Sequence, residues 1–261
     1  MPPRVIVTRA AREAARWVRE LNARGIDACA LPLIDIVAEP LTGTLARARE
    51  HLSDYQAAMF VSANAARGFL GPTTLPALTA IETRAWSTGP GTTQAVLDAG
   101  WPAARVDAPP TDAAQFDSEA LWARVRDQIR PGLSVLIVRG GDADGRPAGR
   151  HWLADQLRAA GVLVHQIAAY RRIAPVLDDS QRALAAAAAG DGSLWLFSSS
   201  EAIANLRAAL PGQDWASAKG LATHPRIAQA AREAGFGIVR DVRPTVDAVA
   251  ASIERDQGRA P

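Results

Sequence analysis

The sequence predicts an α/β protein made of two related units, each with a parallel β-sheet flanked by helices. Apolar runs that end in a loop and lead into a helical stretch recur along the chain, as at 5–7 and 135–138. Sequence motifs also recur at a nearly constant separation of about 136 residues, such as Gly25 and Gly161. Alternating strands and helices favour a parallel sheet. A repeat far longer than the roughly 20–50 residues of solenoid proteins indicates two similar domains.

Length and composition fit this fold. The 261 residues suffice for two domains, and 48% of them are apolar, enough for two cores. The net charge is +2, and no basic cluster typical of nucleic-acid binding occurs. Cys29 is the only cysteine, which excludes an intramolecular disulfide and a cysteine metal cluster, and we expect it to pack as a small apolar residue.

The N-terminal region and the lengths of the apolar runs bear on location. An apolar strand begins already at Val5, so we expect no signal peptide. No apolar run approaches the roughly 18 residues that a membrane-spanning helix needs. We therefore expect a cytoplasmic protein.

The first half of the chain alternates strands and helices. A helix at 10–24 has one apolar face and ends at Gly25, a residue suited to a helix C-terminus. Ser118 is a plausible N-cap for a later helix. Further strands are predicted at 4–8, 27–31, 57–61, 85–87 and 105–107, with an extended proline-bounded segment at 32–40. Further helices are predicted at 45–52 and 119–129. Two more helices begin at the turns 62–64 and 89–93, and the second of these ends near residue 100.

The second half repeats this order. The strand at 135–138 is expected to break at Arg139-Gly140-Gly141 into a loop, and a helix follows at 151–160. An extended ribbon at 169–175 ends in a proline, as does the segment at 32–40. The motif at 196–200 matches the one at 60–64, and 224–236 matches 89–101.

Four of the predicted strand-to-helix turns carry hydroxyl groups or glycines. They are Ser62-Ala63-Asn64, Gly89-Pro90-Gly91-Thr92, Ser198-Ser199-Ser200 and Thr223-His224-Pro225. Such turns present backbone N–H groups and helix N-termini at the carboxyl edge of a sheet, where anions and ligands of α/β proteins bind. The alternative is that these residues only cap their helices.

Three arginines and one tyrosine are further candidates. Arg9 and Arg139 each follow the first strand of a unit, where they could hold carboxylates or form ion pairs, with Asp27 and Asp142 respectively. Arg146 lies in a glycine-rich loop, which is not a Walker motif because no Gly-Lys-Ser/Thr follows. Tyr170 lies on the predicted ribbon and is either a proton donor or an amphipathic packing residue.

Several classes of site are not supported by the sequence. The glycines at 89–91 lack the spacing of a dinucleotide fingerprint, and no Gly-x-Ser-x-Gly of a hydrolase occurs. The histidines do not cluster at metal-ligand spacing, so we expect no metal site. They are His51, His151, His165 and His224.

Taken together, the motifs resemble those of the uroporphyrinogen-III synthases of bacterial type. The matching segments, in order, are VIVTR (5–9), FVSANA (60–65), TGPGT (88–92), DSEAL (117–121), LIVRG (136–140) with Gly145-Arg146, AAYRRIAP (168–175), LFSSSEAI (196–203) and HPRIAQAA (224–231). The resemblance implies two flavodoxin-like parallel-sheet domains joined by a two-stranded ribbon, with the chain crossing from domain 1 to domain 2 and back. The implied boundaries are 1–33 and 175–261 for domain 1, 40–168 for domain 2, and 34–39 and 169–174 for the ribbon.

The resemblance also implies a reaction. The family closes linear hydroxymethylbilane into uroporphyrinogen III, inverts the D ring and releases water, in haem biosynthesis. It needs no metal and no cofactor. The implied partner is this small molecule alone, with a monomeric enzyme and a hand-over of substrate from hydroxymethylbilane synthase. The alternative function is a two-lobed module that binds or senses a polycarboxylate without chemistry.

Candidate site residues follow from the turns, the arginines and the resemblance. Tyr170 matches the proton donor proposed for the family. The substrate carries acetate and propionate side chains, which hydroxyls, helix N-termini and arginines are suited to hold. The residues expected to bind it are Arg9, Ser62, Asn64, Gly89, Thr92, Thr93, Arg139, Arg146, Ser198, Ser199, Thr223 and Arg226.

Overall fold

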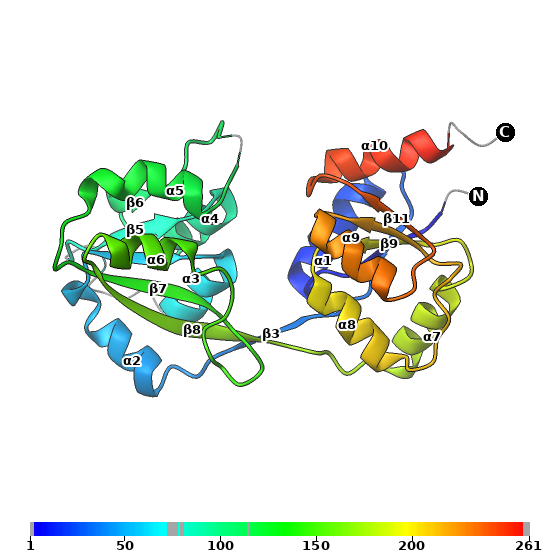
Figure 1. Cartoon of the computed structure of the whole chain (residues 1–261), viewed down its shortest axis with the longest axis horizontal. Helices are drawn as coiled ribbons and strands as arrows, with labels where there is room; N and C mark the ends of the chain where they lie inside the picture. Colours follow the sequence, from blue (N-terminus) through cyan, green and yellow to red (C-terminus); the bar gives the residue numbers. More distant parts are fainter. Residues whose placement is uncertain (1–2, 72–77, 79–80, 114, 258–261) are drawn as a thin grey trace. The chain divides into compact units, whose positions relative to one another are not determined.

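The computed structural model of the chain describes residues 3–71, 78, 81–113 and 115–257 (Figure 1). It divides into two compact units, residues 1–35 with 173–261 (unit 1) and residues 36–172 (unit 2). The chain therefore passes from unit 1 into unit 2 and returns. Both passages fall inside the segments 34–39 and 169–174 that were predicted to form the ribbon.

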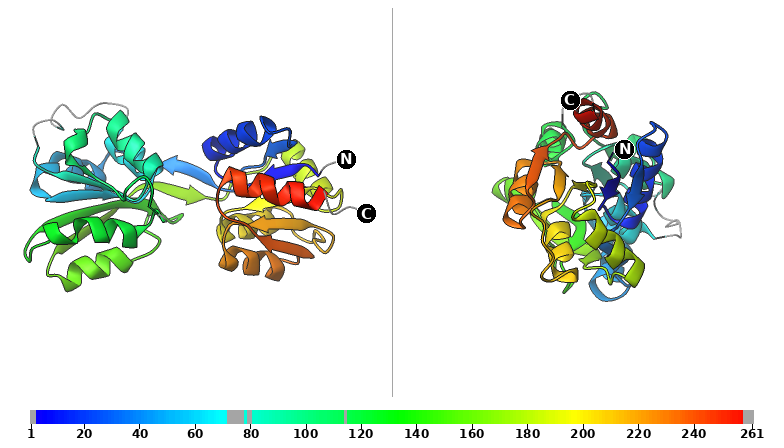
Figure 2. Two further views of the ribbon diagram at one scale, coloured as in Figure 1. Left: turned by 90° about the horizontal axis from the view of Figure 1, so that it is seen from above. Right: turned by 90° about the vertical axis from the view of Figure 1, so that its right-hand side faces the viewer.

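Unit 1 contains a five-stranded parallel sheet with the order β11-β10-β9-β1-β2. Its strands are β1 (Val5–Val7), β2 (Ala28–Ala30), β9 (Leu194–Phe197), β10 (Lys219–Ala222) and β11 (Ile238–Asp241). Its helices are α1 (Ala11–Asn22), α7 (Asp179–Ala188), α8 (Ser200–Ala209), α9 (Pro225–Glu233) and α10 (Val246–Gln257). Helices α1 and α10, from opposite ends of the chain, pack side by side (Figure 2).

Alternation along the strands builds the two faces of this sheet. Leu194 and Leu196 of β9 pack with the buried face of α1 and α10. Their neighbours Trp195 and Phe197 point the other way, because successive residues of a strand face opposite sides. There Trp195 meets the rings of Trp215 and Phe236.

Unit 2 contains a six-stranded sheet with the order β3-β8-β7-β4-β5-β6. Its strands are β3 (Asp35–Ala38), β4 (Ala57–Phe60), β5 (Arg84–Ser87), β6 (Val106–Asp107), β7 (Ser134–Gly141) and β8 (Leu163–Ile173). Its α-helices are α2 (Gly43–Glu50), α3 (Ala63–Leu70), α4 (Pro90–Asp98), α5 (Ser118–Val125) and α6 (Trp152–Ala159), with 3-10 turns at Leu52–Asp54, Ala103–Arg105 and Arg126–Gln128. The pairs β8-β7, β7-β4, β4-β5 and β5-β6 are all parallel.

The two faces of this second sheet have separate cores. Phe60, Leu136 and Val138 pack with residues of α2, α3 and α4 on one face. Met59 and Ile137 pack with residues of α5 and α6 on the other. The predicted α/β fold with two parallel-sheet units is thus confirmed.

Two local predictions were wrong. The strand that was expected to break at Arg139 continues through Gly141, and a bulge between Arg139 and Gly140 lets it pair with β8 to its end. The helix expected to be capped by Ser118 is capped by Asp117, whose Oδ1 accepts from the N–H of Ala120 at 2.8 Å. Both residue types are good N-caps, so composition alone did not separate them.

Within the described ranges, none of the helices combines the length and the apolar character that a membrane crossing requires.

The short edge strand β6 is held by a two-fold ion pair. Arg84 of β5 donates from Nε to Oδ2 of Asp107 at 2.6 Å and from Nη2 to Oδ1 at 2.9 Å. Asp107 is only 4% exposed, whereas Arg84 keeps some contact with water. Parallel hydrogen bonds between a guanidinium and a carboxylate are among the stronger polar contacts in proteins.

We expect Asp107→Ala to lower the free energy of unfolding by about 1.5–3 kcal/mol, the usual worth of hydrogen bonds to charged groups. Chemical denaturation followed by circular dichroism measures this. The matched control is Asp155→Ala, which removes the exposed pair with Arg158 and should change stability by at most about 0.5 kcal/mol. Equal effects of the two substitutions would contradict this assignment.

Candidate functional site

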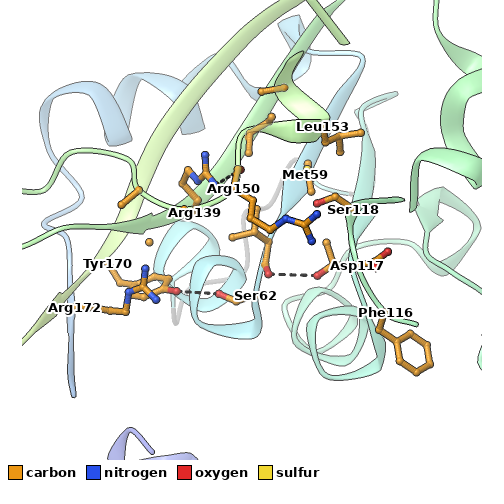
Figure 3. A pocket seen from close by; sticks show the side chains of 17 residues that line it. Met59, Ser62, Phe116, Asp117, Ser118, Arg139, Arg150, Leu153, Tyr170 and Arg172 are labelled. Carbon is orange, nitrogen blue, oxygen red and sulfur yellow. Dashed lines mark hydrogen bonds between the residues drawn. The ribbon is translucent and has the colours of Figure 1, made fainter. Parts of the chain in front are cut away.

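A pocket opens at the carboxyl edge of the unit 2 sheet, with a volume of about 360 Å³ (Figure 3). It is formed by the ends of β4, β7 and β8, the first residues of α5 and the loop before α6. We call it the Tyr170 pocket. Its lining residues are Met59, Val61, Ser62, Thr88, Phe116, Asp117, Ser118, Ile137, Arg139, Gly140, Ala148, Gly149, Arg150, Leu153, Ala154, Tyr170 and Arg172.

Tyr170 brings a hydroxyl group to this pocket. Its side chain is 7% exposed, and its hydroxyl oxygen lies 3.3 Å from Oγ of Ser62 (Figure 3). Ser62 is the N-cap of α3 and accepts from the N–H of Ala65 at 3.1 Å. Either hydroxyl can donate in the Tyr170–Ser62 contact, so the phenol has a proton to give to a group in the pocket.

The position of Tyr170 depends on a glycine. The register shift after Arg139, where β8 carries the extra residue Ala169, places Gly140 opposite Tyr170, and a Cβ atom at position 140 would lie 2.6 Å from Cζ of the tyrosine ring. A side chain there would displace the ring. Gly140 therefore serves the close approach of two strands, and the strand does not end at this residue.

Arg139 is the most deeply buried charge of the pocket, at 4% exposure. It donates from Nη1 to Oε1 of Gln166 at 2.7 Å and from Nη2 to the carbonyl oxygen of Arg150 at 2.6 Å. Burial lowers the pKa of Arg139 below its usual value, and the charge of Arg172 lowers it further, while Tyr170 acts in the opposite direction. A guanidinium still remains protonated at neutral pH.

Other charged groups of the pocket were not predicted. Arg150 pairs through Nη2 with Oε1 of Glu119, in the first turn of α5. Asp117 caps that helix. Arg172 lies two residues after Tyr170 on β8, and strand alternation, which turns such residues to one face, was a signal that pointed to it. Phe116, Ser118 and Arg150 carry no comparable signal in the sequence.

Several predicted residues of unit 2 lie outside the lining. Thr93 is used within its own turn, with Oγ1 at 2.7 Å from Oγ of Ser87 and 3.1 Å from the carbonyl oxygen of Gly89. Thr92 is buried, and it is Thr88 of this turn that lines the pocket. Arg146 is exposed and pairs with Asp144 at 3.2 Å. Asn64 is in the first turn of α3 but is not among the lining residues.

The two hydroxyl turns of unit 1 follow the neighbouring parallel strands β9 and β10 and so share one edge of that sheet. Ser198 begins the first of them. Oγ of Ser199 caps α8 by accepting from the N–H of Glu201 at 3.2 Å. In the second turn Nδ1 of His224 accepts from the N–H of Arg226 at 3.1 Å, and the hydroxyl residue before it is Thr223. The Arg226 side chain is exposed.

Arg9 of unit 1 is partnered locally. It pairs with Glu13 at 3.1 Å, and its guanidinium carbon lies 4.4 Å from the ring centroid of Trp17. Burial lowers the pKa of Arg9, and Glu13 opposes this. The ion pairs considered from the sequence are not formed in the described part of the chain, since Asp27 pairs with Arg4 and Arg139 binds neutral oxygens.

No group of three or more histidine, cysteine, aspartate or glutamate side chains that could hold a metal ion is found among those that the structure describes.

Comparison with known proteins adds two findings. The family model described as uroporphyrinogen-III synthase HemD matches residues 15–251. A solved structure of uroporphyrinogen-III synthetase from Helicobacter pylori is similar with a TM-score of 0.61 at 15% identity, covering 98% of this chain and 100% of the other. A mutant uroporphyrinogen III synthase from Thermus thermophilus has a TM-score of 0.55 at 16% identity, covering 99% and 100%. At such identity the structures show the shared fold.

We expect Gly140→Ala to lower the free energy of unfolding by about 1–3 kcal/mol, the usual cost of overpacking a tight site. Thermal and chemical denaturation measure the effect. Gly190→Ala is the matched control, because an added Cβ there meets no atom within 4 Å among the described residues. If Gly140→Ala were as stable as the control, the close contact with Tyr170 would not hold.

Proposed function

The chain belongs to the uroporphyrinogen-III synthase family, and we propose that it converts linear hydroxymethylbilane to uroporphyrinogen III with inversion of the D ring. The match of the family model over residues 15–251 carries this conclusion. Its substrate is thus a small tetrapyrrole of haem biosynthesis. No observation favours a module that binds a polycarboxylate without chemistry.

The chemistry is that of a hydro-lyase that closes a ring. The C–O bond of the terminal hydroxymethyl group breaks, and the departing oxygen takes up a proton and leaves as water. The resulting azafulvene cation, on the ring that carried the hydroxymethyl group, is attacked by the substituted α-carbon of the D ring at the other end of the chain, which gives a spiro intermediate. Fragmentation and reclosure then invert that ring, and a proton is lost at the end. Each step needs positioning and proton transfer, which the side chains and backbone of a protein can supply.

Tyr170 is the residue we propose as proton donor for the departing hydroxyl group. It is the acidic hydroxyl that lies in the Tyr170 pocket beside Ser62 at 3.3 Å, and its neighbours include three arginines. A substrate with many carboxylates is attracted to this positive lining. A substrate held there by its carboxylates would present its terminal hydroxymethyl group to the fixed hydroxyl of Tyr170.

The predicted binding residues remain part of the proposal, but they differ in whether their side chains line the pocket. Ser62 and Arg139 line the Tyr170 pocket, whereas Thr93 binds within its own turn. Where hydroxyls are occupied, the backbone N–H groups at the helix starts are the expected donors to carboxylates. In unit 1, the same proposal applies to the Ser198-Ser199 and Thr223-His224 turns, with Arg9 and Arg226 as nearby cations.

The proposal also covers the location, the oligomeric state and the domain boundaries of the enzyme. We propose that it is a cytoplasmic monomer, with domains at 1–33 with 175–261 and at 40–168. Hydroxymethylbilane closes without the enzyme to the uninverted isomer. Direct hand-over from the synthase that makes hydroxymethylbilane would limit this loss.

The direct test of the function is the isomer that forms. We expect the purified protein, given freshly made hydroxymethylbilane, to yield the type III isomer on chromatography of the oxidised product. Buffer without protein supplies the control and yields type I. Only type I product in the presence of folded protein would contradict the proposal, and binding without turnover would support the sensor alternative.

We expect Tyr170→Phe to reduce kcat by roughly 10²-fold, since loss of a general acid commonly costs at least that much. Stability should change by less than about 1 kcal/mol, because only one weak hydrogen bond is lost. Tyr55→Phe is the matched control, as Tyr55 is the other tyrosine and does not line the Tyr170 pocket. A wild-type kcat for Tyr170→Phe would remove this residue from the mechanism.

A further inference from the structure

Arg139 has a buried donor that the protein does not use. Its Nη1 and Nη2 bind Gln166 and the Arg150 carbonyl, but Nε is buried and has no hydrogen-bond partner among the described residues. A buried donor without a partner is unfavourable, and such groups in native proteins usually have a reason. Because Arg139 lines the Tyr170 pocket, an occupant of this pocket could supply the partner.

The charge of Arg139 also has no counter-ion in the described part of the chain. Both of its hydrogen-bond acceptors are neutral oxygens. The acidic residues at the start of α5 have other partners, since Asp117 caps the helix and Glu119 pairs with Arg150. A buried cation without an anion is costly, and an anionic ligand that enters the pocket removes this cost.

The geometry holds the guanidinium in place before any ligand arrives. Nη2 of Arg139, which donates to the Arg150 carbonyl, also lies close to Gly149, where a Cβ atom would be 3.0 Å from it. Gly149 also has a φ of +114°, a conformation that favours glycine. The loop before α6 is therefore built around the arginine, which pre-organises the cation.

The pocket around Arg139 suits a carboxylate on an apolar arm. Met59, Ile137 and Leu153 provide apolar walls, which exclude water and strengthen charge-assisted hydrogen bonds. Acetate and propionate side chains have this combination of a short apolar arm and a terminal anion.

We propose that Arg139 forms a preformed subsite in unit 2 that takes one acetate or propionate carboxylate of the substrate. The subsite rests on the proposed function for the identity of its ligand. Arg139 is a binding and specificity residue in this account, and Tyr170 in the same pocket provides the chemistry. Lysine would be a poor substitute because it lacks the planar fork that binds Gln166 and Arg150 while keeping Nε free.

The test compares Arg139→Met with the wild type in steady-state kinetics and in binding of uroporphyrin III, the stable oxidised form of the proposed product. We expect KM for hydroxymethylbilane and Kd for uroporphyrin III to rise by about tenfold to a hundredfold, the loss of one charge-assisted hydrogen bond. The change in kcat should be much smaller. A purely structural role would lower stability but leave KM and Kd of the folded protein unchanged.

Matched variants make the result decisive. Arg158→Met removes an exposed arginine of α6 that pairs with Asp155 and should retain wild-type KM and Kd. If Arg139→Met does not fold, Arg139→Gln, which can still donate to the Arg150 carbonyl, carries the same test. Arg139→Lys should recover only part of the affinity.

The outcomes separate this subsite from the function as a whole. Wild-type KM and Kd in a folded Arg139→Met or Arg139→Gln protein would overturn the subsite, even if the wild type makes the type III isomer. If the wild type made only type I, the proposed function would fail. A weaker Kd of the Arg139 variants for uroporphyrin III would then still support a carboxylate subsite.

Discussion

The close contact between Gly140 and the ring of Tyr170 is the constraint on which the site in unit 2 depends. The bulge after Arg139 sets this register, so that arginine and tyrosine lie on neighbouring strands and both reach the Tyr170 pocket. A side chain at position 140 would push the ring away from Ser62. Because position 140 is a glycine, β7 and β8 can pair closely while the proposed proton donor stays in place.

The positive charge of the Tyr170 pocket suits the proposed substrate, which carries several carboxylates. Its lining has three arginines, one of them buried with only neutral partners, and a single aspartate that caps α5. Such a lining favours a ligand with several carboxylates. For a substrate that closes without help to the wrong isomer, holding the chain in one conformation is the main task, and a proton donor completes it. The pocket has few reactive side chains, which is consistent with an enzyme that mainly holds its substrate in one conformation.

Much of the fold was predictable, because alternating apolar runs and helices and the repeat at about 136 residues are properties of the sequence itself. The resemblance, and not the periodicity, indicated that the chain crosses between units. The site was less predictable. Gly140-Gly141 looked like a break because the residues of β8 that approach them, Tyr170 at Gly140 and Ala168 at Gly141, lie far along the chain. Arg150 and Phe116 reach the pocket only through tertiary packing.

The central claim is that the Tyr170 pocket binds the tetrapyrrole. A crystal structure of the protein with uroporphyrinogen III bound under reducing conditions tests it most directly. The account predicts a ring of the product against Tyr170, with one of its carboxylates within hydrogen-bond distance of Nε of Arg139. A bound product that leaves both side chains without contact would contradict it.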